Sequence, residues 1–133
     1  MKRISIVVDK SMSAGQKANI AAILAGQLAK DAPHLYEAPV IDQSGICHSG
    51  IAVNIVVLEG GSEQLLSLIK SIGENEVMYS VFSSTGQSLS NSYPEYQQRV
   101  SLMDTRSTGI IGIGLAGEDS RVKLLTKKFS LMK

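Results

Sequence analysis

Polar and charged side chains gather directly after the first apolar segment of the chain, Arg3–Val8. In open α/β sheets, ligands bind beyond the carboxyl ends of the strands, where the next helix begins. Free backbone N–H groups and the helix dipole favour an anion at such a helix start. We therefore expect one wall of a ligand site here. Its candidate residues are Asp9, Lys10, Ser11, Ser13, Lys17 and Asn19.

A second group of polar residues follows the predicted strand Val77–Ser83. Ser84, Thr85 and Gly86 combine two hydroxyl groups with a small residue that a ligand can approach closely. These residues could bind the same ligand from the opposite wall. Serine-rich turns also use their hydroxyl groups to bind their own backbone, and this alternative stays open.

The single thiol, Cys47, lies next to His48, one of two histidines in the chain. Adjacent side chains in an extended segment point to opposite sides, so the two make a poor nucleophile–base pair. No cysteines and histidines have the spacing of a zinc site. We predict no metal and assign no catalytic residue from this pair, whose role stays open.

The residues that follow the first strand form a long helix up to Ala32. Ser13 and Gln16 have the spacing of a capping box, which predicts the helix start. One row of small residues, Ala18, Ala22, Ala25 and Ala29, is expected to bring the helix close to a sheet. A second row consists of Ile20, Leu24 and Leu28.

The rest of the chain alternates between strands and helices. Further strands are expected at Ala52–Leu58, Val77–Ser83 and Gly109–Leu115, and the glycines of the last one indicate close backbone contact or a bulge. Helices are expected from Ser62 to Gly73, from Pro94 to Met103 and from Asp119 or Ser120 onward, with loops at Pro33–Ser49 and Ser83–Ser92. This order predicts an α/β fold with three layers, α/β/α, around a four-stranded mixed sheet.

Length and composition predict a single domain, residues 1–133, that does not cross a membrane. The first apolar run ends at Asp9 and is too short for a signal peptide. A single cysteine fits a reducing compartment, so we expect a cytoplasmic protein. No nucleotide-binding fingerprint is present, and no cofactor is expected.

The net charge is +1, but basic residues concentrate at both chain ends. If the ends meet on one face, that face could attract a phosphate-bearing ligand or a nucleic acid. Alternatively, lysines such as Lys127 and Lys128 only solvate a terminal helix. The sequence does not decide whether the protein binds nucleic acid.

Several segments together resemble the type-two peptidyl-tRNA hydrolases. The resemblance starts with a strand, a Met-containing loop and an Ala-rich helix, and it continues through a second strand and helix, a glycine-rich last strand and the C-terminal tail. The matching residues are Val7–Val8, Met12, Gly15, Ile20–Ala22, Ile55–Leu58, Ser62–Glu63, Leu65–Leu66, Ile110–Gly114, Leu125–Thr126, Phe129 and Leu131–Met132. The resemblance implies the peptidyl-tRNA hydrolase II-like fold and a homodimer.

The catalytic positions differ from that family. Its catalytic lysine, glutamine and histidine fall at Asn19, Ile23 and Gly26, and its Asp-Ala-Gly loop falls near Ser84–Gly86. Leu89–Thr105 looks like an insertion with its own helix. This combination is similar to a family of uncharacterised bacterial proteins that share the hydrolase fold. Because the ionisable groups are missing, the resemblance does not imply peptidyl-tRNA hydrolysis.

Three functions follow as hypotheses. The first is binding of a small or phosphate-bearing ligand between Asp9–Asn19 and Ser84–Gly86, without the parent catalysis. The second, if the protein is an enzyme, is a hydrolase of peptidyl-tRNA or of an acyl ester or amide, using Lys17, water and Ser84. The third is a homodimeric interaction module that pairs through the Ala–Gly face of the first helix or through a sheet edge.

Overall fold

A computed structural model describes residues 1–133 and contains one five-stranded mixed sheet. The strand order is β5-β6-β1-β4-β7. β1 is parallel to β4, and the other pairs in this sheet are antiparallel. The strands are β1 (Lys2–Asp9), β4 (Ile55–Gly60), β5 (Met78–Ser83), β6 (Ile110–Glu118) and β7 (Ser130–Leu131). The predicted count of four strands is therefore wrong, because the two residues of β7 are too few to show an alternating pattern.

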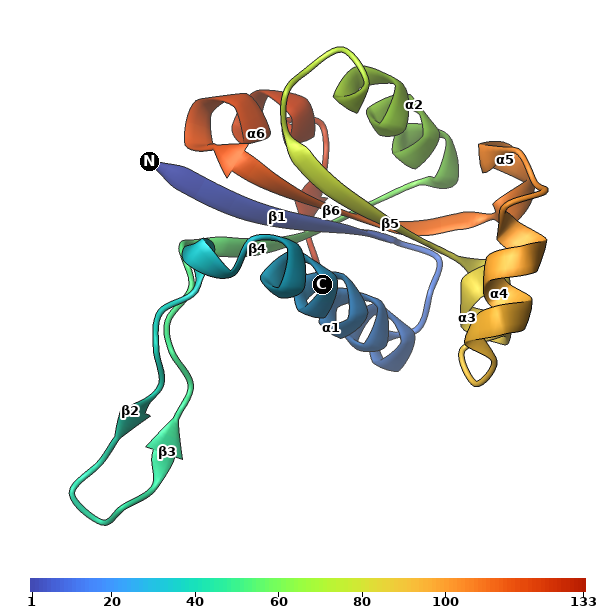
Figure 1. The fold of residues 1–133 in the computed structure, drawn as a ribbon. Coiled ribbons are helices and arrows are strands. Elements are labelled where there is room, and N and C mark those ends of the chain that lie inside the picture. Colours follow the sequence, from blue (N-terminus) through green and yellow to red (C-terminus); the bar gives the residue numbers. More distant parts are fainter.

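Helices lie on both faces of this sheet (Figure 1). α1 packs on one face, while α2 and α6 pack on the other. Three short helices, α3 to α5, connect β5 to β6. The helices are α1 (Ala14–Asp31), α2 (Ser62–Ile72), α3 (Ser84–Ser88), α4 (Tyr93–Val100), α5 (Thr105–Thr108) and α6 (Asp119–Thr126), with a 3-10 turn at Pro33–Leu35.

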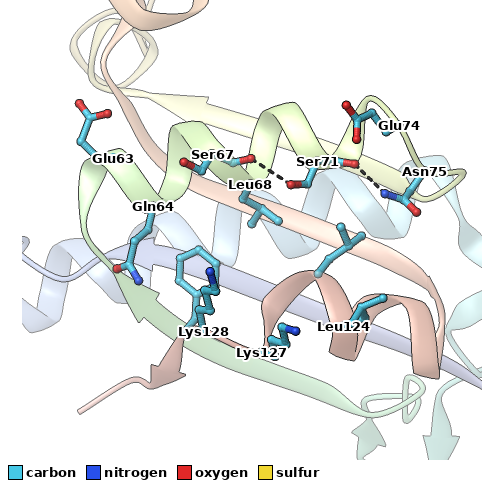
Figure 2. A pocket seen from close by; sticks show the side chains of 12 residues that line it. Glu63, Gln64, Ser67, Leu68, Ser71, Glu74, Asn75, Leu124, Lys127 and Lys128 are labelled. Atoms are coloured by element: carbon cyan, nitrogen blue, oxygen red, sulfur yellow. Dashed lines mark hydrogen bonds between the residues drawn. The ribbon is translucent and has the colours of Figure 1, made fainter.

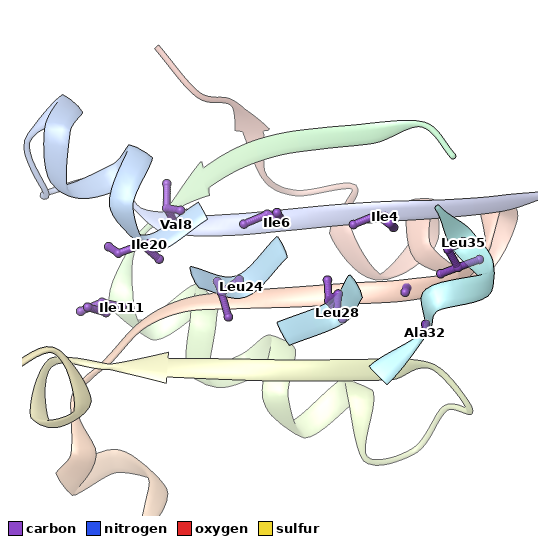
Figure 3. Close-up of a cluster of buried hydrophobic side chains, with 10 residues drawn as sticks. Ile4, Ile6, Val8, Ile20, Leu24, Leu28, Ala32, Leu35 and Ile111 are labelled. Carbon is purple, nitrogen blue, oxygen red and sulfur yellow. The ribbon is translucent and has the colours of Figure 1, made fainter. Parts of the chain in front are cut away.

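The central strand β1 is buried on both faces, as its apolar sequence predicts. Ile4, Ile6 and Val8 point toward α1 and share a cluster with its buried residues (Figure 3). Val7 points the other way and belongs to the cluster under α2 and α6. Side chains alternate between the two faces of a strand, so each polar residue at the end of β1 also faces one defined side.

α1 contacts the sheet mainly through its larger aliphatic residues, and the expectation for its alanine row holds only in part. Ile20, Leu24 and Leu28 are buried, and Ala25 is partly buried against the same cluster, whereas Ala18 and Ala22 are exposed. The close approach of helix and sheet comes from glycines of β6. A Cβ atom at Gly112 would lie 2.5 Å from Ile20 Cγ2, and one at Gly114 would lie 2.9 Å from Leu28 Cδ1. The predicted close backbone contact at these glycines is thus confirmed.

The start of α1 and the end of α2 agree with their sequence signals. The Gln16 N–H donates to Ser13 Oγ at 3.2 Å, and the Ser13 N–H donates to Gln16 Oε1 at 3.0 Å, which is the predicted capping box. α2 ends at Ile72 with Gly73 as its cap.

Both segments predicted as loops contain regular structure. Pro33–Ser49 contains the 3-10 turn and a hairpin of β2 (Val40–Ile41) and β3 (Cys47–His48), which projects from the body of the protein (Figure 1). Ser83–Ser92 contains α3, whose N-cap is Ser83. Serine is both a turn residue and a favoured helix cap, so its local signal does not separate the two structures.

Basic residues of the two chain ends come together at two acidic side chains. Near the start of β1, Arg3 and Lys123 both form ion pairs with Asp119, and Lys2 Nζ lies 2.8 Å from Glu118 Oε1. At the other end of β1, Lys17 Nζ and the N–H of Lys133 both donate to Glu59 Oε1. These basic residues are therefore partly neutralised where they meet.

Candidate functional site

The two predicted polar regions both reach one hollow at the carboxyl end of β1. This strand-end hollow has a volume of about 340 Å³. Its lining comes from the loop after β1, the first turns of α2 and α3, the segment around α5 and the start of β6. The lining residues are Asp9, Met12, Ser62, Glu63, Leu66, Ser84, Arg106, Gly109, Ile110 and Ile111.

Asp9 is the most buried ionisable group of the hollow, with 8% of its surface exposed. Its Oδ1 atom accepts hydrogen bonds from the Ser11 N–H at 2.9 Å and from Ser11 Oγ at 2.8 Å. Its other oxygen, Oδ2, accepts no hydrogen bond from the protein. Asp9 shares its face of β1 with Val7, which explains why it points toward the α2 side.

The start of α2 leaves backbone donors without a protein acceptor beside this carboxylate. Its cap residue, Gly61, has no side chain, so no side-chain oxygen accepts from the first turn. Gln64 Oε1 accepts only the Gly61 N–H, at 2.8 Å. Ser62 and Glu63 belong to this first turn and line the hollow. Such an uncapped helix start can accept an anionic or hydrogen-bond-accepting group.

An exposed ion pair joins α5 to α2 at the same place. Arg106 Nη1 lies 2.9 Å from Glu63 Oε1, and Arg106 Nη2 lies 3.4 Å from Glu63 Oε2. The hydrogen bond from Arg106 lowers the pKa of Glu63 below its ordinary range. Both side chains are largely exposed, so the ion pair is weak and a ligand anion can compete with Glu63 for Arg106.

The serine-rich segment after β5 uses most of its polar groups within the protein. Thr85 Oγ1 donates to the Thr108 carbonyl at 3.0 Å, and Ser84 Oγ donates to the same carbonyl at 3.3 Å. The Gly86 N–H donates to Ser83 Oγ at 3.0 Å. Of the three residues expected here, only Ser84 lines the hollow; Thr85 and Gly86 do not.

Lys17 lies on the other face of the sheet from Asp9. Its Nζ atom donates to Glu59 Oε1 at 2.8 Å, and only 9% of the Lys17 side chain is exposed. Glu59 is paired with Val8 in the parallel ladder, and Val8 faces α1. The Lys17 hydrogen bond is the largest cause of a lowered pKa at Glu59. Lys17 thus binds α1 to β4 and does not reach Ser84.

The remaining predicted residues of the first wall also lie outside the hollow. Asn19 is exposed on the surface of α1, and Lys10 is exposed beside Gly61. Ser13 serves as the cap of α1. The structure therefore brings together Asp9 and Ser84 from the two predicted regions. It adds residues that the sequence interpretation did not include, above all Arg106, Glu63 and Ser62.

A larger groove of about 540 Å³ runs between α2 and α6 (Figure 2). Two of its polar side chains bind the backbone of α2 itself: Ser71 Oγ donates to the Ser67 carbonyl, and Asn75 Nδ2 donates to the Ser71 carbonyl. The sequence interpretation did not find this groove. Its lining residues are Glu63, Gln64, Ser67, Leu68, Ser71, Glu74, Asn75, Leu124, Leu125, Lys127, Lys128 and Phe129. We favour the strand-end hollow because Asp9 lies in it. This residue is largely buried, and one of its two carboxylate oxygens accepts no hydrogen bond from the protein.

Cys47 and His48 lie on the projecting hairpin, far from this hollow. His48 Nε2 lies 2.7 Å from Asp42 Oδ2, and the Cys47 side chain is exposed. The structure contains no group of three or more histidine, cysteine, aspartate or glutamate side chains that could hold a metal ion. None of the helices is both long and apolar enough to cross a membrane.

Comparisons with known proteins identify a family and a fold. A family profile described as "Protein of unknown function (DUF2000)" matches residues 2–133. A solved structure of a protein of unknown function, Atu0240 from Agrobacterium tumefaciens strain C58, is similar with a TM-score of 0.87 and 18% identity. That match covers 99% of this chain and 98% of the other. A comparison with curated proteins gives no significant match.

Proposed function

The chain belongs to the DUF2000 family of proteins of unknown function, and we propose that it binds a small polar ligand in the strand-end hollow. The observation that carries this proposal is Asp9, which is 8% exposed and whose Oδ2 atom accepts no hydrogen bond from the protein and is not enclosed by it. Water can therefore reach this oxygen, and a ligand that displaces the water must supply a hydrogen bond in its place. A ligand with a hydrogen-bond donor would do so.

The lining of the hollow defines the chemistry of this ligand. Asp9 favours an amine or amide group. The first turn of α2 and the Arg106 side chain favour an acceptor or an anion, such as a carboxylate or phosphate. Apolar side chains of Met12 and Ile110 also line the hollow. The proposed ligand class is therefore a small molecule that carries both an amine and an anionic group.

We further propose that the protein has the three-layer α/β/α arrangement of the peptidyl-tRNA hydrolase II type without the catalysis of that family. The helices on both faces of the mixed sheet support the arrangement. The neutral residues Asn19, Ile23 and Gly26 support the absence of that catalysis, because none of them ionises. The single exposed thiol, Cys47, is compatible with a cytoplasmic location.

A hydrolase mechanism through Lys17 and Ser84 has no support from the geometry. Lys17 forms an ion pair with Glu59 on the α1 side of the sheet and does not line the hollow, whereas Ser84 does. Ser84 Oγ already donates to the Thr108 carbonyl. No base within the hollow is hydrogen-bonded to this hydroxyl group, as nucleophilic catalysis requires.

Isothermal titration with two probes tests the proposal. Phosphoethanolamine carries both an ammonium and a phosphate group, whereas inorganic phosphate lacks the ammonium group. We expect phosphoethanolamine to bind about 10- to 100-fold more tightly, because a charge-assisted hydrogen bond to Asp9 adds about 1.5 to 3 kcal/mol.

Two carboxylate variants make this experiment specific. Asp9→Asn should abolish the preference for phosphoethanolamine. Asp31→Asn, which removes the same charge from an exposed position on α1, should retain the preference. Absence of binding by both probes, or an unchanged preference in Asp9→Asn, would contradict the proposal.

A further inference from the structure

The groove between α2 and α6 follows the whole length of α2 (Figure 2), and we call it the α2–α6 groove. Its lining on the α2 side begins at Glu63 and ends at Asn75. α2 has 11 residues, which corresponds to three turns and a length of about 16 Å. The groove shares only Glu63 with the strand-end hollow. It is therefore a separate, elongated surface whose length matches a helix of about three turns.

α2 and α6 run in opposite directions along the groove. A Cβ atom at Gly60, just before α2, would contact both the Phe129 ring and Gln64 Oε1, so the end of α6 lies at the start of α2. A Cβ atom at Gly117, two residues before α6, would lie 3.2 Å from Val77 Cγ1. The start of α6 therefore lies near the end of α2, and Figure 2 shows the same antiparallel arrangement.

The two ends of the groove carry opposite charges that no ion pair neutralises. Lys127 and Lys128 lie toward the start of α2, and Glu74 lies just beyond its last turn. All three residues are exposed, and none of them forms an ion pair within the chain. Glu63 also lies at the lysine end, but Arg106 already holds its carboxylate. The groove is thus basic at one end and acidic at the other.

The walls between these charged ends are apolar on the α6 side and small on the α2 side. Leu125 is partly buried against Leu68, whereas Leu124 is 63% exposed and nothing covers it. Ser67 and Ser71 face this wall from α2, and Ser71 Oγ already donates to the Ser67 carbonyl at 3.2 Å. Small side chains allow another helix to approach closely. A partly apolar groove of this kind is a surface on which amphipathic helices dock.

We propose that the α2–α6 groove docks an amphipathic helix of a different protein, with acidic residues in its first turn and basic residues in its last turn. The acidic residues pair with Lys127 and Lys128, and the basic residues pair with Glu74, so the docked helix lies parallel to α2. Apolar residues on its inner face cover Leu124. The same distribution of charges also complements the dipole of the docked helix itself.

Charge complementarity favours this occupant over a lipid or a nucleic acid. An alkyl chain with one anionic head group can pair with the two lysines, but it offers nothing to Glu74 about 16 Å away. Glu74 also repels a polyanion such as a nucleic acid or an anionic membrane surface. A helix with charges of opposite sign at its two ends satisfies both ends of the groove.

The helices of this chain do not fit the groove of a second copy. α1 has no acidic residue in its first turn. α4 carries Glu95 and Arg99 at its two ends, but these side chains pair with each other. α3 and α5 have only five and four residues, and α2 and α6 form the groove itself. The partner is therefore expected to be a different protein.

Fluorescence anisotropy of the full chain with two labelled peptides tests the proposal. Both peptides have about 14 residues, a row of leucines on one face and a lactam bridge on the other face that holds the helix. The first carries two glutamates in its first turn and two arginines in its last turn, and the second has these charges exchanged. We expect micromolar binding of the first peptide, about tenfold tighter than that of the second.

Variants of the two lysines make this experiment specific. Lys127→Glu/Lys128→Glu should remove or reverse the preference between the peptides. The matched control Lys30→Glu/Arg121→Glu makes the same charge change at exposed residues outside the groove and should retain it. Leu124→Ser should weaken both peptides severalfold and leave their ratio unchanged, because it removes only apolar contact. Circular dichroism verifies that each variant is folded.

Several outcomes would overturn the proposal. They are equal binding of the two peptides by the native protein, a preference that Lys127→Glu/Lys128→Glu retains, and no binding of either peptide. Binding of dodecanoate in place of the peptides would assign the groove to a small amphiphile instead. None of these measurements depends on phosphoethanolamine or on Asp9, so the proposal for the strand-end hollow stands or fails independently.

Discussion

Lys17 and Glu59 form an almost completely buried ion pair, with 2.8 Å between Lys17 Nζ and Glu59 Oε1. The pair joins the first helix to β4 across a separation of 42 residues in the chain. The N–H of Lys133 donates to the same oxygen, so the C-terminus is also tied to this position. A lysine that the sequence offers as a ligand-site residue is therefore part of the packing between α1 and the sheet.

Removing one partner of this pair should destabilise the protein more than removing both. Lys17→Met leaves the Glu59 carboxylate buried without a cation, which is the costly case for buried ion pairs. The double variant Lys17→Met/Glu59→Leu removes both charges and should recover part of the lost melting temperature. Differential scanning calorimetry measures both effects. Equal melting temperatures of Lys17→Met and the native protein would show that the ion pair contributes nothing.

The stability contributed by this pair should depend on pH in one direction. The hydrogen bond from Lys17 lowers the pKa of Glu59 below its ordinary value of 4.5 in the folded protein. The stabilisation is therefore present above pH 4.5 and is lost as the pH falls through the folded-state pKa. Urea unfolding should show that Glu59→Gln is destabilising at pH 7 and that the difference shrinks steadily below pH 4.5. A difference that grows on acidification would contradict this assignment.

Gly112→Ala should destabilise the protein because no space exists for a Cβ atom. That atom would lie 2.5 Å from Ile20 Cγ2 and 2.9 Å from Leu24 Cδ1. Overpacking of this kind costs about 1 to 3 kcal/mol in the free energy of unfolding. Gly26→Ala is the matched control on the exposed surface of α1, where nothing lies within 4 Å. It should stabilise the helix by about 0.5 to 1 kcal/mol. Similar effects of both substitutions in urea unfolding would disprove the packing described for α1.

Glu63→Gln should increase the affinity of the hollow for inorganic phosphate. Glu63 holds the Arg106 guanidinium through two hydrogen bonds, and the substitution releases this cation for an anion. We expect severalfold tighter binding by isothermal titration. Glu95→Gln, which breaks an exposed ion pair with Arg99 on α4, should have no effect. A lower affinity in Glu63→Gln would exclude competition between Glu63 and the ligand.

Local signals in the sequence predict much of the fold. The capping box at Ser13, the apolar alternation of β1 and the terminal glycine of α2 each depend on residues a few positions apart. They were confirmed because such short-range interactions do not require knowledge of the tertiary structure. The order of strands and helices follows for the same reason.

The buried face of α1 could not be predicted, since both of its candidate rows are apolar. Gly112 and Gly114 decide between them, and they lie about 90 residues later in the chain than Ile20 and Leu24. The glycines accept the larger side chains of the second row. The alanine row is consequently left near the surface.

The candidate site was predictable only in part. Asp9 follows directly from its position at the end of a strand. Arg106 and Glu63 reach the hollow through helices whose placement depends on the whole topology, and no local motif indicates them. The orientation of Lys17 depends on the register between β1 and β4, which places Glu59 beside Val8.

Amide chemical-shift mapping with phosphoethanolamine tests the central claim most directly. In a titration of the isotope-labelled full chain, we expect concentration-dependent shifts at the amides of Ser62, Ser84 and Gly109. The amides of α1 from Lys17 to Asp31 should not shift, because this part of the helix lies on the other face of the sheet. In Asp9→Asn these shifts should be lost or strongly reduced. Shifts confined to the groove between α2 and α6, or no shifts at all, would contradict ligand binding in the strand-end hollow.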